Sequence, residues 1–123
     1  MKKIPTVEGV LIGLGITPAM EHFELTVEFF KTFVELRETK YKKKKMTTTC
    51  VYEEVSKRTG VNPKTIESFV RRNLNAGYKK SKFKYIFNYF NIELETGFRP
   101  SITELANLMV LVDRDRRRQE TSV

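Results

Sequence analysis

The sequence predicts an all-α fold of about six helices with a central helix-turn-helix, in a single domain that spans residues 1–123. In every strong pattern of the chain, apolar residues recur three and four positions apart, which is the spacing of one helical face. The alternation typical of strands is absent apart from a weak pattern at residues 91–95. A short turn at Gly60 separates two amphipathic segments in the middle of the chain, and 123 residues is a typical length for one domain.

Two helices are predicted before the middle of the chain. The first is short and ends near Gly15, and its apolar residues are Val7, Val10, Leu11 and Leu14. Pro18 opens the second helix, which is about twenty residues long by its periodic pattern and could extend to Tyr41. The apolar face of this second helix consists of Phe23, Val27, Phe30 and Val34.

The central helix-turn-helix is predicted at about residues 50–77. Gly60 follows the last periodic residue of its first helix and can take the left-handed conformation that ends a helix. Asn62 suits the N-cap of the second helix, and Pro63 suits the first helical position. Gly77 ends this second helix. Its apolar face consists of Ile66, Phe69, Val70 and Leu74.

Two further helices are predicted toward the C-terminus. The first is short and covers residues 83–90, and a loop at residues 96–100 follows it. Ser101 and Glu104 then form a capping box, which starts the last helix. We expect the basic tail at residues 114–123 to fray. The apolar face of the last helix consists of Ile102, Leu105, Ala106, Met109 and Val112.

The second helix of the central unit would turn a polar face to solvent. Arginine can donate two hydrogen bonds to guanine, serine and threonine can contact several base edges, and glutamate can accept from cytosine. We therefore predict DNA base contacts from Lys64, Thr65, Glu67, Ser68 and Arg71. Contacts with the DNA backbone are predicted for Arg72, Lys57, Arg58, Lys79, Lys80, Lys43 and Lys44. The alternative is an ordinary helical hairpin with a solvated charged face.

The positive charge of the chain is concentrated around this unit. The net charge is +8, with fifteen basic and four acidic side chains between residues 37 and 85. That segment carries a net charge of +11, whereas residues 1–36 carry −2 and residues 86–123 carry −1. Such a distribution is typical of a protein that binds phosphate groups of nucleic acid.

Other classes of protein are disfavoured by the sequence. No run of about eighteen apolar residues is present, so we expect no membrane span and no membrane partner, and no convincing signal peptide is found. The single Cys50 leaves no internal disulfide and fits a reducing cytoplasm, although a reactive thiol is an alternative role. We expect no enzyme, metal, cofactor or small-molecule substrate, because the only histidine, His22, has no cluster of ligands or catalytic partners nearby in sequence.

Four motifs, in consistent order and spacing, carry a family resemblance. They are LGITP at residues 14–18, VYEEVSKR at 51–58, IESFVRR at 66–72 and RPSITELA at 99–106. Together they cover roughly residues 8–112 and resemble the C-terminal DNA-binding effector domain of stage zero sporulation protein A. That family consists of response regulators that start endospore formation in Firmicutes.

The resemblance implies a sequence-specific transcriptional regulator that binds double-stranded DNA, with two protomers on tandem sites and the C-terminal helix near their contact. Glu67 and Arg71 match the family, whereas Thr65 and Ser68 stand where it tends to carry arginines. We expect no receiver domain and hence no control by phosphorylation, so the chain would be an orphan relative. The alternative is a protein-interaction module, or a non-specific nucleic-acid binder, that modulates a full-length relative.

Overall fold

The computed structural model describes residues 3–93 and 99–121, and this part of the chain is all-α, with six helices and no strand. The helices are α1 (Val7–Gly13), α2 (Phe23–Glu38), α3 (Thr48–Thr59), α4 (Pro63–Ser81), α5 (Lys84–Tyr89) and α6 (Ile102–Thr121). The predicted fold class is therefore confirmed. The loop predicted at residues 96–100 lies partly outside the described residues.

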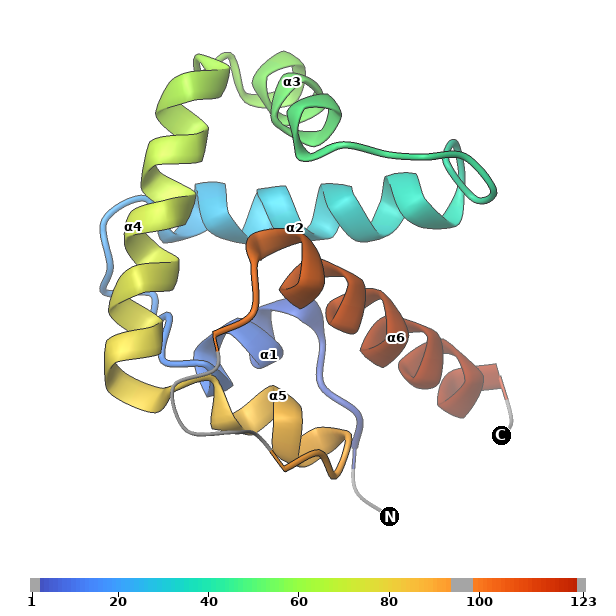
Figure 1. Ribbon diagram of the computed structural model, residues 1–123. Helices are drawn as coiled ribbons and strands as arrows, with labels where there is room; N and C mark the ends of the chain where they lie inside the picture. Colours follow the sequence, from blue (N-terminus) through green and yellow to red (C-terminus); the bar gives the residue numbers. More distant parts are fainter. Residues whose placement is uncertain (1–2, 94–98, 122–123) are drawn as a thin grey trace.

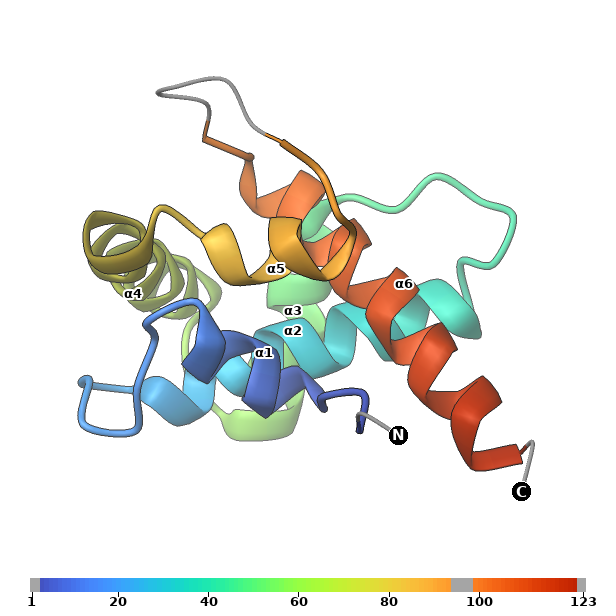
Figure 2. The same cartoon turned by 90° about the horizontal axis from the view of Figure 1, so that it is seen from below.

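α2 lies at the centre of the molecule and contacts α1, α3, α4 and α6 (Figure 1). Phe29, Phe30 and Phe33 of this helix are buried. Phe29 stacks on Tyr52 of α3 with ring centroids 4.6 Å apart and meets Phe30 edge to face at 5.0 Å. Large aromatic side chains bury much apolar surface, so α2 supplies the middle of the core. Figure 2 shows α4 and α6 on opposite sides of α2, with α1 and α5 between them.

α2 is shorter than predicted at both ends. It begins at Phe23 instead of Pro18, because His22 takes the left-handed conformation (φ 57°) and the preceding residues form a turn in which the Met20 amide donates to the Thr17 carbonyl. It ends at Glu38, and the Tyr41 amide then donates to the carbonyl of Leu36 at 2.8 Å. Local turn hydrogen bonds thus replace helical ones at both ends.

A short turn joins α3 to α4. Gly60 has φ 76°, and its amide donates to the Ser56 carbonyl at 2.8 Å, which closes the end of α3 as predicted. The Asn62 side chain accepts from the Lys64 amide at 2.9 Å and caps α4, with Pro63 in its first turn. Sequence chemistry therefore located this turn correctly.

The prediction that Gly77 ends the second helix is wrong, because α4 continues to Ser81 and Gly77 lies inside it. A Cβ atom at this position would lie 2.8 Å from Ile16 Cγ1 and 2.9 Å from the Leu14 carbonyl oxygen. The glycine is needed for the close approach of α4 to the segment after α1. The helix ends instead where Lys82 turns left-handed (φ 54°).

A buried polar link fixes α4 against α2. Asn73 is 5% exposed, and its side-chain amide donates to Thr26 Oγ1 at 2.8 Å and to the Glu21 carbonyl at 3.3 Å. Thr26 is itself fully buried. A buried amide is costly unless it is hydrogen-bonded, so this pair favours one rotation of α4 on α2.

α6 starts as predicted, with Ser101 and Glu104 exchanging hydrogen bonds at 2.9 and 3.1 Å. The predicted fraying from residue 114 is wrong for the described residues, because α6 continues to Thr121. Ion pairs hold its second half on the end of α2. The Glu38 carboxylate, only 14% exposed, lies 2.6 Å from Arg114 Nε and 3.3 Å from Arg117 Nη2. Sequence periodicity missed this extension because polar contacts, not apolar ones, hold it.

Candidate nucleic-acid interface

One face of α4 is directed to solvent along its length. The side chains of its core face are Ile66, Val70, Asn73, Leu74 and Gly77. The exposed residues on the other side are Lys64, Thr65, Ser68, Arg71, Arg72, Asn75, Lys79 and Lys80. These side chains provide donors and acceptors, and the single carboxylate of α4, that of Glu67, is paired with Arg71. The surface therefore suits an anionic, hydrogen-bonding partner.

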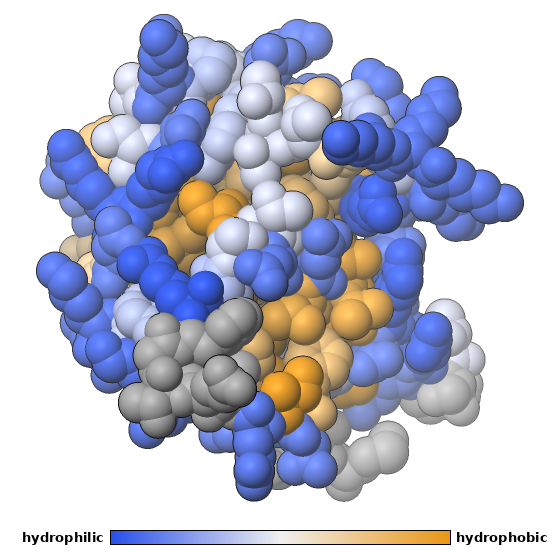
Figure 3. All heavy atoms as spheres, viewed as in Figure 1, coloured by the Kyte–Doolittle hydropathy of each residue, from blue (hydrophilic) through white to orange (hydrophobic). Residues whose placement is uncertain are grey.

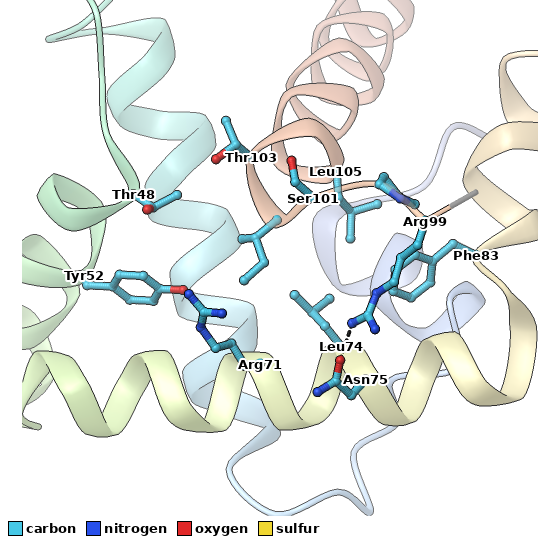
Figure 4. A pocket seen from close by; sticks show the side chains of 12 residues that line it. Thr48, Tyr52, Arg71, Leu74, Asn75, Phe83, Arg99, Ser101, Thr103 and Leu105 are labelled. Atoms are coloured by element: carbon cyan, nitrogen blue, oxygen red, sulfur yellow. Dashed lines mark hydrogen bonds between the residues drawn. The ribbon is translucent and has the colours of Figure 1, made fainter. Parts of the chain in front are cut away.

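The structure separates the five predicted base-contact residues into two groups. Lys64, Thr65 and Ser68 are exposed on the outer side of the first turns of α4. Glu67 and Arg71 pair with each other, with 3.1 Å from Arg71 Nε and 3.0 Å from Nη2 to Glu67 Oε1. Arg71 extends toward α3 and the start of α6, on the flank of the helix (Figure 4). The first group is directed outward, and the second group lines one edge of the surface.

Arg72 marks the opposite edge of this surface. Its guanidinium carbon lies 5.2 Å from the centroid of the Phe69 ring, which in turn lies 3.8 Å from the ring of His22. Phe69 is thus half-buried between the turn before α2 and Arg72, and it is not in the core as the periodic pattern predicted. A cation stacked on an aromatic ring has a restricted side chain, which favours a directional contact.

The predicted backbone contacts also separate. Lys57, Lys79 and Lys80 are exposed. Arg58, by contrast, lies 2.8 Å from Glu35, 3.7 Å from Glu54 and 3.8 Å from Glu28. The hydrogen bond to Glu35 raises the pKa of Arg58 further, in spite of partial burial. We assign Arg58 to the packing of α3 on α2 and leave it out of the candidate surface.

Lys43 and Lys44 lie in the connection between α2 and α3, at the end of α2 opposite to α4 in both cartoon views. Arg37 donates to the Lys44 carbonyl at 3.0 Å and to that of Tyr41 at 3.3 Å, which folds this segment back on α2. Figure 3 shows hydrophilic side chains over α4 on one edge and over this connection on the other. The structure therefore does not bring the two lysines next to α4.

A polar pocket of about 380 Å³ lies between α3, α4 and the start of α6 (Figure 4). Arg71 and Arg99 extend into it, and the hydroxyl of Tyr52 points toward it from α3. Arg99 donates to Asn75 Oδ1 and lies over the ring of Tyr78, 4.9 Å from its centroid. Two cations thus share one hollow beside the exposed face of α4.

Sequence reasoning identified neither Asn75 nor Arg99 as a site residue. Asn75 lies seven positions after Ser68, or about two helical turns, so helical spacing could have found it. Arg99 is 24 positions from Asn75, and no pattern in the sequence connects the two. Only the fold places Arg99 beside α4.

Among the described residues, no group of three or more His, Cys, Asp or Glu side chains could hold a metal ion. None of the described helices combines the length and the apolar character that a membrane span requires. Hydrogen bonds from Thr47 lower the pKa of the Cys50 thiol, which is half-buried at the start of α3. Among the described residues, no imidazole group lies beside this thiol.

Comparison with known proteins gives no relative for this chain. No protein-family model, no curated protein and no solved structure matches it.

Proposed function

We propose that the protein is a sequence-specific DNA-binding regulator of transcription that acts in the cytoplasm, with α3, the turn at Gly60 and α4 as a helix-turn-helix. α4 would enter the major groove. The observation that carries this proposal is the division of α4 into two faces. One face is fixed by buried side chains, and the other presents a row of exposed donors and cations, whose single carboxylate, that of Glu67, is paired with Arg71.

The positions along α4 suggest a division of roles. Lys64, Thr65 and Ser68 lie near its N-terminus, the end with which recognition helices usually contact base edges. Arg72, restricted by its ring contact, would bind guanine or a phosphate. Glu67 and Arg71 would contact bases from the flank if their mutual pair opens. Backbone phosphates would be bound by Lys57, Lys79 and Lys80.

The resemblance to the sporulation effector domain supports regulation of transcription as the biological role. The positive charge around α4 supports nucleic acid as the partner.

Two protomers on neighbouring sites are part of the proposal, with α6 near their contact, since Leu111 on this helix is 43% exposed. Sedimentation on DNA with one and two sites would test this, and Leu111→Ser should then reduce binding of the second protomer.

Selection of bound fragments from random DNA, followed by fluorescence anisotropy at ~150 mM salt, tests the main proposal. The wild-type protein should bind selected DNA at least ~10³-fold more tightly than random DNA. Ser68→Ala with Arg72→Ala should reduce this discrimination by about 1–3 kcal/mol for each base that is no longer recognised. Arg118→Ala on the distant end of α6, whose side chain is 79% exposed, is the matched control and should bind as wild type. Equal binding of selected and random DNA by the wild-type protein would reject sequence-specific recognition.

A further inference from the structure

The pocket beside α4 contains an unsatisfied hydrogen-bond donor. Tyr52 is 5% exposed, and its buried hydroxyl has no hydrogen-bond partner among the described residues. Its ring is held by stacking on Phe29, so the hydroxyl is directed to the pocket by the packing of α3 on α2. Burial, together with the nearby Glu67 carboxylate, raises the pKa of Tyr52 to about 12, and the hydroxyl therefore stays protonated near neutral pH. A buried donor without a partner is rare in folded proteins, which points to a missing acceptor.

The start of α6 contributes two more donors to the same pocket. The capping box uses the amides of Ser101 and Glu104. The amides of Ile102 and Thr103 have no partner within a helix that begins at Ile102, and both residues line the pocket. The N-terminus of a helix of this length also carries a partial positive charge. The two residues whose amides the capping box leaves open thus line the same pocket as Tyr52.

Two guanidinium groups complete this arrangement. Arg99 is held in place by Asn75 and by the ring of Tyr78. Arg71 contacts Glu67 through Nε and Nη2, and these contacts do not need its Nη1. No acidic residue lines the pocket. Arginine pairs and helix N-termini are the groups with which proteins bind tetrahedral oxyanions.

We propose that the pocket between α3, α4 and α6 is a binding site for a phosphate group. The Tyr52 hydroxyl, the Ile102 and Thr103 amides, and the guanidinium groups of Arg71 and Arg99 are its donors. This site does not depend on DNA recognition by the outer face of α4. The phosphate group belongs either to a free anion or to a DNA backbone that reaches this flank of α4.

Titration of isotope-labelled protein with sodium phosphate, at constant ionic strength and without DNA, tests the site. Saturable shifts of the Ile102 and Thr103 amide signals are expected in the spectrum of the wild-type protein. Tyr52→Phe and Arg99→Ala should each raise the dissociation constant roughly ten-fold or more. Tyr85→Phe on α5 and Arg118→Ala on α6 are matched controls and should leave it unchanged. The absence of saturable shifts, or wild-type affinity in both pocket variants, would overturn the proposal.

Thermal unfolding separates ligand binding from a structural role of the tyrosine. Without phosphate, Tyr52→Phe should unfold at the wild-type temperature or above, because it removes only an unpaired hydroxyl and keeps the ring that stacks on Phe29. With phosphate, the wild-type protein should gain more stability than the variant. A loss of stability in phosphate-free buffer, with equal gains on addition of phosphate, would contradict the assignment.

DNA binding identifies the source of the phosphate group. If a DNA phosphate occupies the pocket, free phosphate will compete with DNA beyond the effect of ionic strength, and Tyr52→Phe will weaken DNA binding. If the ligand is a free anion, DNA affinity will be the same in the variant. Because the phosphate titration contains no DNA, its failure would leave the proposed DNA recognition intact, and a failure of DNA binding would leave the phosphate site intact.

Discussion

Gly77 lies where α4 passes close to the segment that leads from α1 to α2. A side chain there would meet both Ile16 and the backbone oxygen of Leu14 at under 3 Å. Ile16 can shift, but the carbonyl belongs to a turn in which the Leu14 amide is itself hydrogen-bonded. The glycine therefore sets the distance between α4 and the N-terminal part of the chain.

We expect Gly77→Ala to lower the free energy of unfolding by roughly 1–3 kcal/mol, as overpacking does in cores. Alanine is the better helix former by about 1 kcal/mol, so any loss of stability would show that the close contact dominates. Urea unfolding measures the difference in unfolding free energy between the wild-type protein and Gly77→Ala. Lys80→Ala, at an exposed position of the same helix, is the control. If Gly77→Ala stabilised the protein, α4 and the segment at Leu14 and Ile16 could move apart at little cost in free energy.

Residue chemistry was predictable from the sequence where it acts locally. Gly60, Asn62 and the capping box at Ser101 behave as their types suggest, because turns and caps depend on immediate neighbours. Gly77 was misinterpreted, because a glycine that ends a helix and one that allows a close contact look alike in one sequence. The role of Arg58 was missed for a similar reason, since its partner Glu35 belongs to another helix.

At the level of elements, α4 depends on its cap. Asn62→Ala removes the acceptor for the Lys64 amide and should cost about 1 kcal/mol of stability. Asn62→Ser keeps a side-chain acceptor and should retain most of the stability. Chemical unfolding of the two variants under the same conditions gives the comparison. Similar losses of stability in Asn62→Ala and Asn62→Ser would show that a side-chain acceptor at this position is not what stabilises the start of α4.

The second half of α6 depends on the Glu38 carboxylate. Burial raises the pKa of Glu38, but the hydrogen bonds and charges of Arg114 and Arg117 outweigh burial, and the pKa lies below its ordinary value. A pKa that is lower in the folded than in the unfolded protein means that the ionised carboxylate favours folding. This contribution is present above the ordinary glutamate pKa of about 4.3 and is lost as the pH falls through the lower pKa of the folded state.

We therefore expect Glu38→Gln to destabilise the protein at neutral pH and to have less effect as the medium becomes acidic. Comparison of unfolding free energies of wild type and variant between about pH 7 and pH 3 tests this linkage. Glu120→Gln, on the exposed end of α6, is the control for loss of a carboxylate. A difference between wild type and Glu38→Gln that stays constant across this range would exclude the linkage.

At the scale of the whole molecule, the basic segments do not form one surface. Lys43 and Lys44 lie at the end of α2 opposite to α4, beside Thr103 and Asn107 of α6, although the sequence places these lysines and α4 within one positively charged segment. The net charges of successive segments of the chain could not show that these lysines and α4 lie apart, because the length and direction of α2 decide where its two ends lie. The number and order of the helices, in contrast, followed from periodicity together with the glycine, proline and capping residues between the periodic segments.

This separation has a measurable effect on DNA binding. Neutralisation of one phosphate contact changes the slope of log K against log salt by about 0.9. Lys79→Ala with Lys80→Ala should therefore reduce the slope by about 1.8, whereas Lys43→Ala with Lys44→Ala should leave it nearly unchanged. Anisotropy titrations at several salt concentrations compare the two double variants. Equal reductions in both would show that DNA extends along α2 to the far lysines.

The contact of Asn73 with Thr26 has a consequence for how the protein could change over time. This hydrogen bond and the close approach at Gly77 fix the rotation of α4 from its inner side. Neither anchor uses a residue of the solvent face, so the positions of Lys64, Thr65, Ser68 and Arg72 are open to mutation at little cost to folding. New binding preferences could thus evolve, or be selected from a randomised library, on a framework that stays the same.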